Sequence, residues 1–182
     1  VVARPLGAVI PGDVVISEFR TIGAGGASDE FIELYNRTNG IIDISGLKIM
    51  GSSSGGSTTT RATIGIVTLL PGQYYLFVNS GASVGLRALE DATYSSGIAN
   101  DGGIALTLSD GTTVIDQVGM SSASAYKEGT ILTPLTSSID QSYERKDGGT
   151  SDSCIYNDNN INDFAQKPSN PQNSSTPLFF TS

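Results

Sequence analysis

The apolar residues of this chain come in short runs, and glycine, serine, threonine, asparagine and aspartate separate each run from the next. Residues 13–20, 29–36 and 74–79 are rich in β-branched and aromatic residues, which favour strands, and the first two of these runs can pair as a hairpin with a long loop. No stretch shows a convincing amphipathic helical period. Roughly eight such runs, with turn signals between them, predict an all-β antiparallel β-sandwich of two sheets, with a barrel as the lesser alternative.

Local patterns give further expectations. The dipeptide Asp110-Gly111 separates residues 103–108 from residues 112–118 and predicts a hairpin. Residues 41–50 carry apolar residues on both sides of Ser45-Gly46, so we expect one bent strand there. Residues 51–60 are mostly serine, glycine and threonine and predict a mobile loop, whereas residues 140–146 alternate in the manner of a solvent-facing strand.

The length of 182 residues is close to one ordinary domain and is short for two separate cores. Prolines and a glycine interrupt the apolar residues 1–12, so we expect an extended N-terminal arm there. The sandwich domain is expected over residues 13–175 and a C-terminal tail over residues 176–182. No apolar stretch approaches the roughly 20 residues that a membrane-spanning helix needs.

Charge and composition argue against several classes of function. The formal net charge of -8 would repel a phosphate backbone, so we expect no nucleic acid partner. The chain has no histidine, which is the commonest general base and zinc ligand. Cys154 has no basic neighbour in sequence that would activate its thiol, and we expect it to be a half-buried small apolar residue. We therefore expect neither catalysis nor a cofactor.

A series of motifs follows one another in an order found in a known family. The motifs are residues 15–19 (VISEF), 29–36 (DEFIELYN), 44–47 (ISGL), 70–74 (LPGQY), 100–103 (NDGG), 106–116, 142–145 (SYER), 160–164 and 168–174. In these segments the chain resembles the lamin tail domain family of the bacterial type, over about residues 13–175. The resemblance implies an immunoglobulin-like β-sandwich. It also implies structural and associative roles, as the tail of filament-forming proteins or as a module of secreted and surface proteins.

Glu18 and Glu33 stand inside otherwise apolar runs, where the acid/base pair of a glycosidase could lie. The stronger expectation is structural, because a buried carboxylate must be paired or hydrogen-bonded. The expected partners are either backbone N–H groups or the basic residues Arg20, Arg37, Lys48 and Arg145.

Residues 147–152 and 157–163 are rich in aspartate and asparagine, whose oxygens suit calcium. Neither segment has the spacing of a calcium loop, and such side chains also close turns by bonding their own backbone. We expect turns, with a structural calcium ion as the alternative; its candidate ligands are Asp147, Asp152, Asp158 and Asp163. The triplets beginning at Asn36 and Asn173 fit the N-glycosylation pattern.

These observations favour a structural protein that assembles with copies of itself or with a surface protein or polymer. The predicted assembly contact lies in the two apolar ends, at Val1, Val2, Leu6, Val9, Ile10, Leu178, Phe179 and Phe180. Such an arm can add to a sheet edge of the next copy and generate a filament. The alternative, in which each end folds back on its own domain, stays open.

A second interpretation is an accessory module that binds carbohydrate, wall polymer or protein. Its stacking faces would come from Tyr74, Tyr75, Tyr94 and Tyr126. Under either interpretation we expect an extracellular or cell-surface location, because the composition is poor in lysine and rich in serine, threonine and glycine.

Overall fold

The computed structural model describes residues 9–147 and 154–178, and these contain twelve strands and two short helices. The strands are β1 (Val14–Arg20), β2 (Phe31–Asn36), β3 (Ile42–Asp43), β4 (Lys48–Ser52), β5 (Thr58–Thr63), β6 (Thr68–Leu69), β7 (Tyr74–Asn79), β8 (Ala92–Tyr94), β9 (Gly103–Thr107), β10 (Val114–Gly119), β11 (Ser142–Arg145) and β12 (Phe164–Lys167). The helices are α1 (Val84–Arg87) and α2 (Asn160–Asp163). Neither helix is long and apolar enough to cross a membrane.

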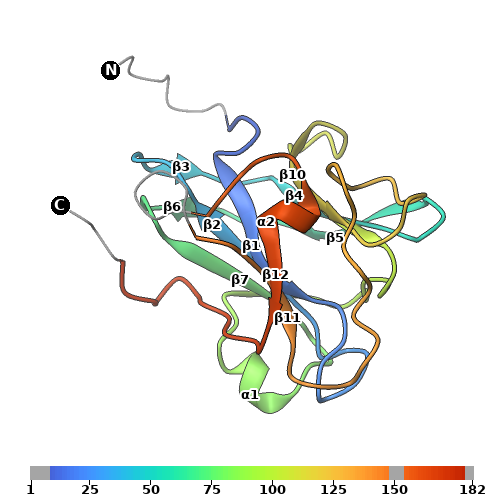
Figure 1. The fold of residues 1–182 in the computed structure, drawn as a ribbon. Helices are drawn as coiled ribbons and strands as arrows, with labels where there is room; N and C mark the ends of the chain where they lie inside the picture. The colour runs from blue at the N-terminus through green and yellow to red at the C-terminus, as the bar shows by residue number, and fades with distance from the viewer. Residues whose placement is uncertain (1–8, 148–153, 179–182) are drawn as a thin grey trace.

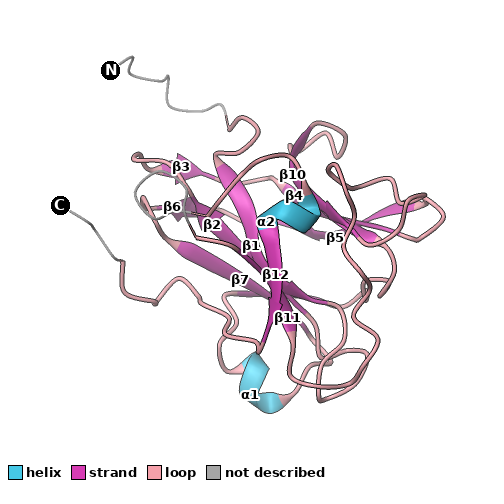
Figure 2. Ribbon diagram, in the orientation of Figure 1, coloured by secondary structure: helices cyan, strands magenta, loops and turns pink. Residues whose placement is uncertain are grey.

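Two main sheets pack against each other (Figure 1). The larger has six strands in the order β12-β11-β1-β2-β7-β8, and the smaller has four in the order β10-β9-β4-β5. Strands β3 and β6 form a separate pair. All neighbours are antiparallel except β7 and β8. Figure 2 shows how little of the described chain is helical. The predicted immunoglobulin-like antiparallel β-sandwich is confirmed.

The predicted hairpins are present. Strands β1 and β2 pair antiparallel, as do β9 and β10. The turn between β9 and β10 is closed by Asp110, whose carboxylate accepts the backbone N–H groups of Thr112 and Thr113 at 2.8 and 2.9 Å. Gly111 has a φ of 72°, a left-handed conformation that favours glycine.

Three local expectations were wrong. Residues 41–50 form two strands in different sheets, because the chain turns at Gly46, whose φ is 78°. Residues 51–60 are part of the β4–β5 hairpin and not a mobile loop. Strand β11, expected to face solvent, is interior to the six-stranded sheet, and its residues Tyr143 and Arg145 are buried.

The core between the sheets is apolar and draws on every strand of the two main sheets except β5, whose Ala62 packs at its margin. In β1, Val14, Ile16 and Phe19 enter this core. The core residues are two positions apart from Val14 to Ile16 but three apart from Ile16 to Phe19, because the β1–β2 register shifts between Ile16 and Glu18. This shift returns Phe19 to the core and leaves Glu18 on the opposite face. All seven residues of β1 are nevertheless buried, so both faces of the strand are covered.

The outer face of the six-stranded sheet has two covers. Helix α1 places Leu86 against a small cluster of Phe31, Leu76 and Val78. Beside it, residues 168–176 run across the sheet after β12, and we call this segment the C-terminal strap (Figure 1).

Candidate functional site

Glu18 and Glu33 lie opposite each other on β1 and β2, and each is only 1% exposed. Neither forms an ion pair with any described residue, so the predicted basic partners are wrong. Each carboxylate accepts one hydroxyl and one backbone N–H group: Ser142 Oγ and Asn170 N donate to Glu18, and Ser17 Oγ and Gln172 N donate to Glu33. The alternative that these glutamates accept backbone N–H bonds is therefore confirmed, and both N–H groups come from the C-terminal strap.

The strap meets a third carboxylate. The backbone N–H of Ser174 donates to Asp91 Oδ2 at 2.9 Å, and Asp91 also accepts the N–H of Leu76 in β7 at 2.8 Å. The donors Asn170, Gln172 and Ser174 are alternate residues of an extended segment. We call their acceptors, Glu18, Glu33 and Asp91, the carboxylate row.

Burial is the main cause that raises the pKa of Glu18 and, more strongly, of Glu33. The hydrogen bonds from Ser142 and Ser17 oppose the shift, while Glu144, opposite Glu18 on β11, adds repulsion. Raised pKa values are found in catalytic acids. Here the strap covers both side chains, so a substrate would have to displace it.

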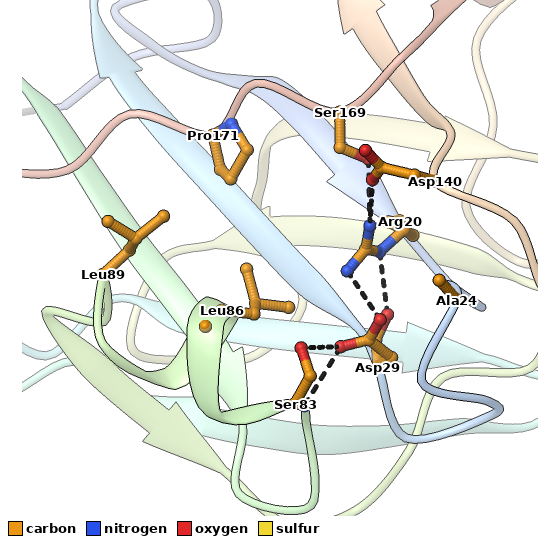
Figure 3. A pocket seen from close by; sticks show the side chains of 10 residues that line it. Arg20, Ala24, Asp29, Ser83, Leu86, Leu89, Asp140, Ser169 and Pro171 are labelled. Carbon is orange, nitrogen blue, oxygen red and sulfur yellow. Dashed lines mark hydrogen bonds and ion pairs between the residues drawn. The ribbon is translucent and has the colours of Figure 1, made fainter.

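A pocket of about 260 Å³ opens beside the strap (Figure 3). Leu86, Leu89 and Pro171 line its apolar side, and Arg20 lies on its polar side. The Arg20 guanidinium bonds Asp29 and Asp140, each at 2.9 Å, and Ser169 at 3.0 Å. Because of these bonds, Arg20 does not pair with Glu18 or Glu33. The polar side chains of the pocket are bonded to one another.

A second buried polar cluster lies where β10, β11 and α2 meet. Arg145 is 2.7 Å from Asp116 and 3.2 Å from Asp163, and all three side chains are fully buried. Arg145 also donates to the backbone carbonyl of Ile16 at 3.0 Å and lies 4.4 Å from the Phe164 ring centre. The pair of Arg145 and Asp116 joins β11 of the six-stranded sheet to β10 of the four-stranded sheet, which indicates a structural role.

The calcium candidates that the structure describes do not form a group that could hold a metal ion. Asp152 lies outside the described residues, while Asp147 and Asp158 are exposed. Asp163 is buried and accepts hydrogen bonds from Arg145 and Asn157. Within residues 9–147 and 154–178 no group of three or more acidic, cysteine or histidine side chains could hold a metal ion. The calcium alternative stays a prediction.

Other residues that the sequence analysis named have structural roles in the described part of the chain. Burial raises the pKa of the Cys154 thiol to about 12, so it is a poor nucleophile. Asn36 is fully buried, and its amide bonds the carbonyls of Gly40, Leu69 and Leu70. Asn173 is half-buried in the strap, where its amide donates to Leu89 O.

The four tyrosines of the binding-module interpretation do not form an exposed platform. Tyr94 and Tyr126 are buried, and Tyr75 packs against the core. Tyr74 is half-buried, with its ring centre 4.8 Å from that of Tyr35.

The predicted assembly residues are only partly described. Val9 packs against the core of its own domain, Ile10 is exposed, and Leu178 is half-buried. The others, Val1, Val2, Leu6, Phe179 and Phe180, lie outside the described residues. The assembly contact therefore stays a prediction.

The family model described as Lamin Tail Domain matches residues 10–122, which include β1 to β10. No curated protein matches the chain.

Proposed function

The chain belongs to the lamin tail domain family, and from this premise we propose that it is a non-enzymatic structural module of an extracellular or cell-surface protein that associates with its own copies. The family is a structural immunoglobulin-like domain. Glu18 and Glu33, whose pKa values burial raises, lie under the strap and accept hydrogen bonds from its backbone, which supports a structural role for them.

The observation that carries self-association is an apolar end of the sandwich. Ile66 is 99% exposed and Ile41 58% exposed, and Ile10 and Leu70 are also exposed. Ile41 directly precedes β3 and Leu70 directly follows β6, beside the paired residues Ile42 and Leu69. The start of β1 and the end of β2 are joined nearby by the bond from Arg37 N to Asp13 O. Exposed apolar groups gathered in one region mark interaction surfaces. In the described part of the chain, the segment just before β1 lies at the same end (Figure 1).

The extracellular or cell-surface location is proposed on composition, since the chain has few lysines and many serine, threonine and glycine residues. Surface proteolysis of intact source cells, followed by detection with an antibody, tests it. Protection of the protein until the cells are lysed would contradict this location.

Light scattering coupled to size-exclusion chromatography tests the association. We expect a concentration-dependent increase in mass that grows with ionic strength, because salt screens the repulsion between copies of net charge -8. The double variant Ile41→Ser, Ile66→Ser should stay monomeric. Val84→Ser is the matched control, because Val84 is 87% exposed on α1, away from β3 and β6 (Figure 1). A wild-type chain that is monomeric at every concentration and salt level would contradict the proposal.

A further inference from the structure

The surface that binds the C-terminal strap contacts mainly its backbone. We call this surface, formed by the carboxylate row with Gln73 and Leu89, the groove. Asn170, Gln172 and Ser174 direct alternate N–H groups to the three acceptors of the carboxylate row. Two side-chain bonds add to these: Gln73 Nε2 donates to Ser174 O at 3.0 Å, and Asn173 Nδ2 donates to Leu89 O at 2.9 Å. The groove therefore selects an extended segment with free N–H groups at every second residue.

The strap contributes little apolar surface to this contact. It consists of serine, asparagine, glutamine, threonine and two prolines, and every one of its residues is half-buried or exposed. Its attachment rests on hydrogen bonds to Glu18 and Glu33 in the sheet. Further bonds go to residues just outside the strands: Gln73, Leu89 and Asp91. Every copy of the chain carries both the groove and the segment that fits it, so the same bonds can form within one molecule or between two.

The connection to the rest of the domain is short. Strand β12 ends at Lys167, and the first docked N–H belongs to Asn170, so only Pro168 and Ser169 intervene. Short, stiff connections of this kind favour exchange of a segment between copies, because a change of backbone angle at the hinge redirects the segment while its contacts are preserved.

We propose that the groove over the carboxylate row is an exchange site that takes residues 168–176 of a second copy of this chain in place of the molecule's own strap. Reciprocal exchange gives a closed dimer. This contact lies on the outer face of the six-stranded sheet and does not depend on the apolar end, so each self-association contact can fail without the other.

Deletion of Pro168 and Ser169 in the otherwise full chain tests the proposal. The deletion removes about 7 Å of reach, so the strap can no longer dock on its own domain. The background is Ile41→Ser, Ile66→Ser, which removes the apolar contact. We expect a dimer by light scattering, whereas the same background without the deletion is mostly monomeric. A synthetic peptide of residues 168–178 should convert the dimer to monomers by filling the grooves.

A peptide carrying Gln172→Pro is the matched control, because it lacks the N–H that Glu33 accepts. It should be at least about tenfold weaker, the loss expected for one hydrogen bond to a charged group. A folded, monomeric deletion variant, judged by circular dichroism, would overturn the proposal. If the deletion prevents folding, a fluorescent form of the peptide titrated into the full-length chain decides: saturable binding that the control peptide lacks supports exchange, and no binding overturns it.

Discussion

Replacement of Arg145 by methionine removes the one positive charge between two buried carboxylates. Arg145, Asp116 and Asp163 all have fully buried side chains, with separations of 2.7 and 3.2 Å. Methionine keeps much of the aliphatic stem and removes the guanidinium. Breaking a buried ion pair by removal of one partner typically costs about 3–5 kcal/mol, because the remaining charge is left uncompensated. Here two carboxylates remain, so we expect a loss at the upper end of that range.

Urea unfolding followed by circular dichroism and tyrosine fluorescence measures the loss, since the chain has no tryptophan. With a slope of about 2 kcal/mol per molar urea, a loss of about 5 kcal/mol moves the midpoint by about 2.5 M. The loss should shrink at low pH, because protonation of Asp116 removes part of the uncompensated charge; burial already raises the pKa of that carboxyl. The double variant Arg145→Met, Asp116→Asn should likewise recover part of the stability.

Lys167→Met is the matched control, because it replaces a basic residue on the neighbouring strand. Lys167 Nζ lies 2.9 Å from Glu144 Oε2, but the side chains are 44% and 29% exposed. Exposed pairs contribute about 0–1 kcal/mol. If Arg145→Met costs no more than this control, the buried cluster does not hold the sheets together and the argument is wrong.

Three further predictions concern protons, metal and catalysis. Burial raises the pKa of the Glu128 carboxyl from 4.5 to about 8, so between these pH values the folded state holds a proton that the unfolded state releases. The free energy of unfolding should therefore fall as pH rises from about 4.5 to about 8. In urea titrations, Glu128→Gln should reduce this fall by at least about 1 kcal/mol. EDTA should change the melting temperature by less than about 5 °C, and a larger fall would favour the calcium alternative. Assays for esterase, glycosidase, protease and nuclease activity should give background rates, and a turnover abolished by Glu33→Gln would restore the catalytic interpretation.

The parts of the fold that follow from short-range signals were predictable. The β9–β10 hairpin follows from Asp110-Gly111, where one side chain and one left-handed glycine close the turn. The β4–β5 hairpin was missed because its sequence is serine, glycine and threonine. Strand β4 is nevertheless paired on both edges by backbone hydrogen bonds, which do not depend on side-chain polarity. A Cβ on Gly51 would collide with the Arg61 side chain, so a larger residue there would displace that side chain.

The carboxylates of the row were only partly predictable. A glutamate inside an apolar run is visible in sequence, and Glu18 and Glu33 were singled out for that reason. Their partners were not, because Asn170 and Gln172 lie 152 and 139 residues further along the chain. Asp91 carries no sequence signal, since it belongs to no apolar run; its role depends on the tertiary position of the strap.

The carboxylate row also explains how a polar segment can be held in a single register. An apolar groove would tolerate sliding of the strap, whereas carboxylates accept N–H groups and repel carbonyl oxygens. A shift by one residue would bring Pro171, which has no N–H, to a position now filled by Asn170 or Gln172 and would leave a buried carboxylate without its donor. Burial of these charged groups therefore costs some stability, but it fixes the register in which the strap binds. A strap from a second copy would have to meet the same requirement, so exchange between copies would preserve the register found within one chain.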